Sequence, residues 1–233
     1  MNHPTDMPAS QASTIDRRRL WIEAAVIVIV AVVPDIVNAA ALLAYPQRAT
    51  QPFWLDGLML AQRSLTVCAV AFFIMWRSGE PRRAFGFARW EWRIDVPLAA
   101  VLVIAGWMLS IAVYSAAQSV FGAAPWRPEQ VARPRTVADF SVLALMITAN
   151  SIAEEVVIWG LLFTRLSALI GGGARVVFIC AAVFASYHIY QGPAGALAVM
   201  SIGLLHGAIF WQSRRLWPLV VAHTALNFVA YLW

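Results

Sequence analysis

The chain has 233 residues, of which 61% are hydrophobic and only 12% are charged, and its mean hydropathy is +0.70. A soluble domain carries about 25% charged residues, so this composition excludes an ordinary soluble domain and indicates a polytopic membrane protein of one domain. The net charge of +5 comes from arginine alone, and the arginines lie scattered between apolar runs. Because they form no basic stripe, the composition argues against a nucleic-acid partner.

The predicted elements are long apolar runs separated by short polar segments. Residues 1–18 are polar, and we expect them to form a mobile cytoplasmic N-terminus. About 20 apolar residues cross a bilayer as a helix, and the runs do not alternate as barrel strands would. We therefore predict an all-α fold, a polytopic membrane helical bundle of about seven transmembrane helices. The predicted spans are 20–44, 55–76, 96–120, 138–164, 174–190, 194–212 and 216–232.

Arginine placement predicts the orientation of these spans. Twelve arginines fall on the side of the predicted bundle where the chain begins, and four fall on the other side. An excess of arginine marks cytoplasmic loops, so we expect an integral membrane protein with a cytoplasmic N-terminus, located in a bacterial inner membrane. The stretch 77–95 mixes arginine with Phe and Trp, which is typical of a segment at the membrane interface.

Several polar residues lie inside the predicted spans. At about 1.5 Å of rise per residue, Glu154, His188, His206, His223 and Asn227 all fall roughly 12–20 Å from the arginine-rich face. Independent structural polar groups would have no reason to share one depth. Polar groups at membrane depth usually face a cavity or a partner, so the agreement predicts a common cavity.

Three short patterns contain most of these residues. The first is the pair Glu154-Glu155, the second is FASYH from Phe184 to His188, and the third is HTALN from His223 to Asn227. The spacing of four in the third pattern places both polar side chains on one helical face. The chain here resembles the CPBP intramembrane proteases, which include CAAX prenyl endopeptidases and the bacteriocin-processing or self-immunity proteins of the Abi type. That family carries EExxxR, FxxxH and HxxxN on successive helices in this order.

The resemblance covers residues 85–233 and implies a domain division and a mechanism. Residues 19–84 are then two accessory transmembrane helices, and residues 85–233 form the protease core. The implied reaction is hydrolysis of a peptide bond in a membrane-associated or prenylated peptide or protein, without a cofactor. Glu154, aided by His188, is expected to activate a water molecule, while His223 and Asn227 donate hydrogen bonds to the oxyanion. Glu155 and Phe184 are expected to contact these groups and hold them in position without reacting themselves.

One position departs from the family pattern, because Trp159 stands where the motif has arginine. Trp159 is four residues beyond Glu155, about one helical turn, so an arginine there would pair with that carboxylate. Glu155 is therefore expected to be protonated or to find another cation, and Arg63 of the second span is the hypothesised partner. The departure keeps open an alternative function, a catalytically degenerate membrane scaffold, assembly factor or immunity protein that acts within a membrane-protein complex.

Other interpretations of the same residues remain open. Glu154, His188 and His223 are legitimate zinc ligands, although the sequence lacks HExxH and the family mechanism needs no metal. A proton-coupled transporter would use the same residue types but should show an inverted repeat, and none is evident. His206 lies on no family motif and is expected to be structural or supporting. Asp35 follows Pro34 and is expected near a kink close to water.

Overall fold

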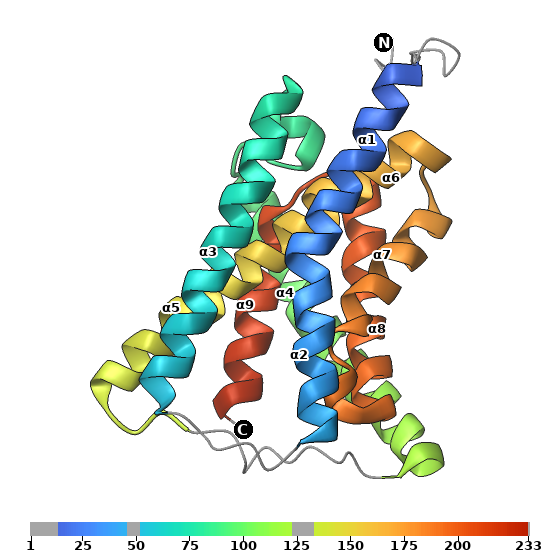
Figure 1. Cartoon of the computed structure of the whole chain (residues 1–233). Helices are drawn as coiled ribbons and strands as arrows, with labels where there is room; N and C mark the ends of the chain where they lie inside the picture. Colours follow the sequence, from blue (N-terminus) through green and yellow to red (C-terminus); the bar gives the residue numbers. More distant parts are fainter. Residues whose placement is uncertain (1–13, 46–51, 123–132, 233) are drawn as a thin grey trace.

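The chain folds into a bundle of antiparallel helices, as shown by the computed structural model, which describes residues 14–45, 52–122 and 133–232. Every regular element in these ranges is helical, which confirms the predicted fold class. The chain enters at one end of the bundle and finishes at the opposite end (Figure 1). Most of the expected N-terminal segment 1–18 lies outside the described residues, and the first helix is already formed at Thr14.

Successive helical segments run up and down the bundle. The first is continuous through α1 (Thr14–Ile27), η1 (Val28–Val32) and α2 (Val33–Ala44). Next come α3 (Phe53–Ser78), the short η2 (Arg82–Phe85) and α4 (Trp92–Phe121). A second continuous segment contains α5 (Val137–Glu155), η4 (Val156–Leu162) and α6 (Phe163–Ile170). The chain ends with α7 (Ala174–Ser186), η5 (Ile189–Gln191), α8 (Gly192–Ser213) and α9 (Trp217–Leu232).

Five segments of the described chain are long and apolar enough to cross a membrane. They begin with α1, α3, α4, α5 and η5–α8, in agreement with five of the predicted spans. The remaining two predicted spans correspond to shorter helices, 13 residues in α7 and 16 in α9. The run predicted as 174–190 stops being α-helical at Ser186, so the last residues of that run form a turn and a 3₁₀ segment instead.

Local sequence accounts for where the helices begin and end. Thr136 and Asp139 form a reciprocal capping box at the start of α5, which satisfies two backbone N–H groups that the first turn leaves open. Pro193 lies in the first turn of α8, where its missing N–H is tolerated. Gly79 ends α3 in the left-handed conformation, at φ 75°, which glycine adopts without a steric penalty.

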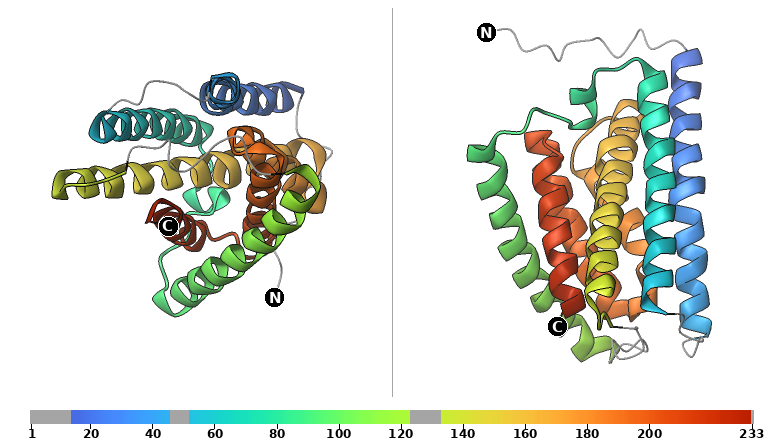
Figure 2. Two further views of the ribbon diagram at one scale, coloured as in Figure 1. Left: turned by 90° about the horizontal axis from the view of Figure 1, so that it is seen from below. Right: turned by 90° about the vertical axis from the view of Figure 1, so that its left-hand side faces the viewer.

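The helix α5 occupies the middle of the bundle (Figure 2). On one side it is covered by α3, with α1 against its continuation in η4 and α6. On the other side it packs against α9, and α8 and α9 are in turn backed by α4. A side chain on α5 can therefore face either the N-terminal helices or the C-terminal pair, according to its position around the helix.

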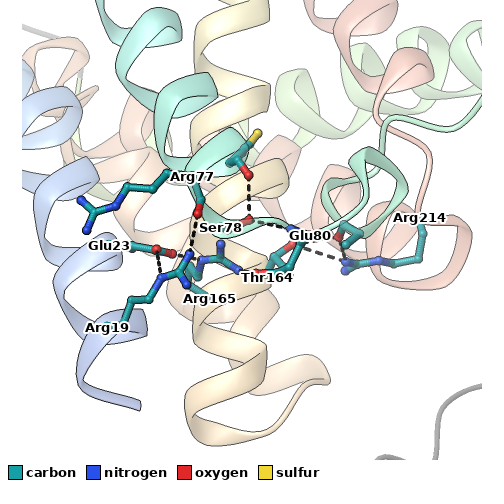
Figure 3. Close-up of polar contacts among 10 residues, drawn as sticks. Arg19, Glu23, Arg77, Ser78, Glu80, Thr164, Arg165 and Arg214 are labelled. Atoms are coloured by element: carbon teal, nitrogen blue, oxygen red, sulfur yellow. Dashed lines mark hydrogen bonds and ion pairs between the residues drawn. The ribbon is translucent and has the colours of Figure 1, made fainter. Parts of the chain in front are cut away.

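Ion pairs hold the elements together at the end where α1 begins (Figure 3). Arg165 of α6 is 1% exposed, and its Nε lies 2.6 Å from Glu23 Oε2 of α1 while its Nη1 donates to Glu80 Oε1 at 2.6 Å. The guanidinium also lies over the Phe85 ring, 5.0 Å from its centroid. The sequence had placed Arg165 among the orientation signals, and the structure shows that it is also a buried bridge between α1, the segment after α3 and α6.

A second ion pair ties the turn between α8 and α9 to α4. Arg215 donates from Nε to Asp95 Oδ1 at 2.6 Å and from Nη2 to Asp95 Oδ2 at 2.8 Å, the bidentate geometry that suits arginine. Asp95 is fully buried. The hydrogen bonds to Asp95 raise the pKa of the Arg215 guanidinium, so the pair stays charged at physiological pH.

Candidate active site

Adjacent carboxylates on α5 form the centre of the site and face different neighbours. Glu155 is 1% exposed, and its Oε1 lies 2.8 Å from His223 Nδ1 of α9 and 3.1 Å from His206 Nδ1 of α8. Both imidazoles donate to the ionised carboxylate, because a carboxylate without a proton can only accept. One oxygen of Glu155 therefore joins three helices of the bundle.

Glu154 lies next to the same histidine on its other side. Its Oε2 is 3.3 Å from His223 Nε2, and Asn150 lies one turn earlier on α5. The Nδ1 proton of His223 is committed to Glu155. The Glu154–His223 contact brings a carboxylate and an imidazole close together beside Glu155, and it is an ion-pair distance rather than an aligned hydrogen bond.

A cavity opens beside Glu154 on the side of the N-terminal helices. The centre of a water-sized sphere can occupy about 20 Å³ of it, which is enough for a water molecule where polar partners are present. The polar lining residues come from α2, α3, α5 and the turn after α7. They are Asp35, Arg63, Ser64, Asn150, Glu154 and Tyr187.

Two π-helical segments flank this cavity. Val28–Val32 of η1 interrupts the first long helix, and Val156–Leu162 of η4 follows directly after Glu155. Residues of both segments line the cavity, among them Ala31 and Val157. Short π segments within α-helices occur frequently at functional sites, because the wider turn re-aims the residues around it.

His188 lies at the end of α7 rather than within a helix. Its Nδ1 is 2.9 Å from the Phe184 carbonyl, so Nδ1 carries the proton and Nε2 of the neutral ring is an acceptor. The Phe184 ring lies between two imidazoles, with centroid distances of 5.0 Å to His188 and 5.8 Å to His223. Phe184 therefore packs where the sequence placed a supporting residue, while the cavity lining contains the neighbouring Tyr187 rather than His188.

The pattern HTALN meets α5 along one face, as its spacing predicts. His223 contacts Glu155, and one turn further along α9 Asn227 donates from Nδ2 to Ser151 Oγ at 3.3 Å. Since α5 and α9 run antiparallel, two pairs with a spacing of four lie opposite each other. The amide of Asn227 is therefore close to the cluster but is bonded to Ser151 in this state.

The structure corrects the hypothesis that Arg63 neutralises Glu155. Arg63 Nη1 lies 2.5 Å from Asp35 Oδ1, and its Nη2 donates to the Ala31 carbonyl at 3.0 Å. Glu155 is paired with imidazoles instead. Asp35 was expected near a kink close to water. It follows the π-helical segment η1, and its side chain is 30% exposed, which agrees with that expectation.

Trp159 does not face the carboxylate that an arginine would meet at this position. It lies within the π-helical segment, is 1% exposed, and packs beside Phe163 with ring centroids 6.3 Å apart. A Cβ on Gly207 of α8 would lie 2.5 Å from the indole ring. Gly207 is therefore the residue that admits Trp159 between α8 and η4.

No group of three or more His, Cys, Asp or Glu side chains in the described residues is arranged to hold a metal ion. Of the three possible zinc ligands, Glu154 and His223 lie together, whereas His188 Nδ1 hydrogen-bonds the Phe184 backbone carbonyl. The donor set that the sequence suggested is thus not assembled in this arrangement.

Three residues that the structure places in the site were not among the site residues predicted from the sequence: His206, Asp35 and Arg63. His206 lay on no motif, although it shared the predicted depth of the other polar residues, and that depth was the signal that could have included it. Asp35 and Arg63 come from helices regarded as accessory, and their pairing could not be read from spacing because they lie on different helices. Both groups lie within the same polar cluster or its cavity.

The class of protein that the fold and the cluster define is a helical bundle of the membrane type, with buried carboxylates and imidazoles beside a water-sized cavity. Residues 136–229 match the family model of Rce1-like type II CAAX prenyl endopeptidases. This match confirms the resemblance read from the three motifs, and the matched segment contains all of them. Together with the apolar helices, it supports an integral membrane protein that contains a segment similar to the CAAX endopeptidases. The comparisons with curated proteins and with solved structures each gave no match.

Proposed function

We propose that this protein is an intramembrane endopeptidase that hydrolyses a peptide bond in a membrane-associated or prenylated peptide or protein. The observation that carries the proposal is the contact of Glu154 with His223 beside a cavity that admits water, within the segment that matches the CAAX-endopeptidase family. Amide hydrolysis without a nucleophilic side chain needs an activated water molecule and hydrogen-bond donors for the oxyanion.

In the proposed mechanism Glu154 accepts the proton of the attacking water, and His188 positions that water with its unprotonated Nε2. As the C–N bond then breaks, Glu154 returns the proton to the nitrogen of the leaving amine. His223 and Asn227 donate hydrogen bonds to the carbonyl oxygen as negative charge develops on it. Asn227 must then leave Ser151 or share its second amide hydrogen with the substrate, since an amide nitrogen has two donors. Glu155 holds His223 by its Nδ1, which fixes the direction of Nε2.

The proposed setting is a bacterial inner membrane with the arginine-rich end, where α1 begins, on the cytoplasmic side. The partners are then the lipid bilayer and a membrane-associated peptide or protein, and not a nucleic acid. A prenylated CAAX protein, a bacteriocin leader and a short membrane peptide are the substrate candidates. No cofactor is proposed, and elemental analysis of the purified protein tests this: stoichiometric zinc that is lost in a His223→Ala variant would replace the metal-free mechanism.

A second candidate function is a degenerate scaffold or immunity protein, and Trp159 in the place of the motif arginine favours it. The environment of Glu155 weighs against this alternative, because two imidazoles supply the hydrogen bonds that an arginine would otherwise provide. The chemistry of the cluster is therefore complete without the motif arginine.

The proposal is tested by proteolysis in detergent on prenylated and unprenylated peptides. Wild type is expected to cleave at least one of them, and Glu154→Gln is expected to lower kcat by about 10²-fold or more because the base is lost while shape is kept. Asp56→Asn is the matched control, since Asp56 is an exposed carboxylate on α3 and should leave activity unchanged. Wild type that cleaves none of the peptides, or a Glu154→Gln variant as active as wild type, overturns the proposal in favour of the scaffold.

A further inference from the structure

His206 belongs to none of the three motifs, yet it contacts the centre of the cluster. Its Nδ1 lies 3.1 Å from Glu155 Oε1, the same oxygen that accepts from His223. The side chains of His206 and Glu155 are 2% and 1% exposed. We propose that His206 is a positioning residue, which holds Glu155 and through it His223 in the orientation that hydrolysis requires. This inference rests on the proposed function and adds a residue to it.

The first argument concerns the burial of Glu155. A carboxylate removed from water needs hydrogen bonds and a compensating charge, or it is strongly destabilising. In the part of the chain that the structure describes, the ion pairs of Glu155 join it to His206 and His223. Without His206, Oε1 would keep a single donor, and that donor is the imidazole whose direction Glu155 has to fix.

The second argument concerns how firmly His206 is held. The neighbouring Gly207 lets α8 approach η4 so closely that a Cβ there would lie 2.5 Å from the Trp159 ring. One turn earlier, a Cβ on Gly203 would lie 3.3 Å from Ala181 and from Phe184. The helix α8 is thus fixed against η4 and α7 on either side of His206. A side chain on such a helix has little freedom to follow Glu155, so it sets the position of that carboxylate.

The third argument is the geometry that results. The rings of His206 and His223 lie edge to face with centroids 6.2 Å apart, and both Nδ1 atoms point at the same oxygen. The proton of His223 Nδ1 is thereby committed, and its Nε2 is aimed at Glu154. His206 therefore acts on the reacting groups through a chain of two contacts and does not touch the cavity itself.

The atom that matters is Nδ1, and this gives a sharp pair of variants. An asparagine amide nitrogen takes nearly the place of a histidine Nδ1, whereas a glutamine amide nitrogen takes nearly the place of Nε2. His206→Asn should keep the donor to Glu155 and retain kcat within about threefold. His206→Gln should lose it and lower kcat by about 10–100-fold, the size of effect seen when a supporting hydrogen bond is removed, with KM changed by less than about twofold. Equal activities of the two variants would overturn the inference, because packing alone does not distinguish them.

A second measurement tests the hydrogen bond between His206 Nδ1 and Glu155 independently of catalytic activity. The imidazole nitrogens of purified, ¹⁵N-histidine-labelled protein in detergent report which ring nitrogen carries a proton, and the His206→Asn spectrum assigns the signal. We expect a protonated Nδ1 at His206 whose shift changes in Glu155→Gln. A neutral His206 protonated at Nε2 would overturn the inference even if the enzyme is active. Wild type that cleaves nothing would instead overturn the proposed function, and the spectrum would still show whether His206 binds Glu155.

Discussion

At the scale of single residues, Trp159 shows how a departure from a family motif can be accommodated. Its indole ring fills the space between η4 and α8 and is buried among apolar groups. Glu155 meanwhile receives its hydrogen bonds from α8 and α9. Trp159 is therefore a packing residue in this chain, not a polar partner of Glu155.

The variant Trp159→Arg is expected to destabilise the protein and not to raise activity. Removing a buried Trp and introducing a charge without a designed partner should lower the free energy of unfolding by about 3 kcal/mol or more. Trp159→Phe, which keeps an aromatic ring, should have a smaller effect. Unfolding in mixed micelles by SDS titration measures both. A more active and equally stable Trp159→Arg would show that an arginine still reaches Glu155 and that the two imidazoles do not replace it.

Gly207 should not tolerate a side chain. A methyl group there would meet the Trp159 ring at 2.5 Å and Val177 Cγ1 at 2.8 Å, so buried neighbours would have to move. We expect Gly207→Ala to lower the stability by about 1–3 kcal/mol, as overpacking does. The control is Gly172→Ala, whose Cβ would meet no atom closer than 3.8 Å. If both variants unfold at the same SDS fraction, α8 approaches η4 less closely than described.

The residues of the cluster illustrate what a single sequence can predict. Depth along the helices predicted that Glu154 and His223 lie at one level, because a helix rises by a fixed amount per residue, and the structure places their side chains 3.3 Å apart. Partners across helices could not be assigned in the same way. Arg63 was proposed as the partner of Glu155, but it pairs with Asp35. The partner of a side chain depends on how each helix is rotated about its own axis. Packing determines that rotation, and sequence periodicity does not define it.

At the scale of elements, the two π-helical segments are the largest departure from the predicted regular spans. Their sequences, VIVAV and VVIWGLL, are as apolar as their surroundings. Apolar composition predicts a helix but does not distinguish an α turn from a wider one, so these segments could not be predicted. They matter because residues of both segments line the cavity beside Glu154.

The ion pair between α2 and α3 is expected to couple these helices. Asp35 and Arg63 are each about 30% exposed, so their interaction should be modest, about 0.5–1 kcal/mol. In a double-mutant cycle, Asp35→Asn and Arg63→Met should each lower the stability, and the double variant should lose less than the sum of the two. Additive losses would mean that the pair does not form in the membrane. Because both residues line the cavity, the single variants should also lower kcat/KM for peptide cleavage.

At the scale of the whole molecule, the N-terminal helices and the family-matched segment are tied together at the end where α1 begins. Arg165 lies within residues 136–229, and its two carboxylate partners, Glu23 and Glu80, lie before them. The same helices supply α2 and α3 to the wall of the cavity. The segment predicted as accessory is therefore part of the site and part of the packing.

Removing the Arg165 guanidinium should weaken the packing of the N-terminal helices against the family-matched segment. Arg165→Met would leave two carboxylates without their shared partner, which typically lowers stability by about 3–5 kcal/mol. Arg83→Gln, at an exposed arginine of η2, should change stability by less than about 0.5 kcal/mol. The comparison uses the same SDS titration, together with limited proteolysis between α3 and α4. Equal effects of the two substitutions would show that the cluster is solvated and contributes little.

More of the architecture than of the candidate site could be predicted from the sequence. The order of the helices followed from the length of the apolar runs, because hydrocarbon admits few alternatives to a helix. The end of α7 was wrong by several residues. Tyr187 to Gln191 are as apolar as many helical segments, and the turn there depends on Gly192 and Pro193 opening the next helix and on α2 packing against it.

The shortness of α7 has a consequence for the surrounding lipid. Thirteen residues rise about 20 Å, whereas the hydrocarbon layer is about 30 Å thick. A helix of this length that begins at the headgroups turns back while it is still within the hydrocarbon layer, where its peptide groups can face only protein or water. Bilayers built from shorter acyl chains would bring the headgroups closer to His188, and those built from longer chains would bury the turn more deeply. The rate of peptide cleavage should accordingly change with acyl-chain length in reconstituted vesicles.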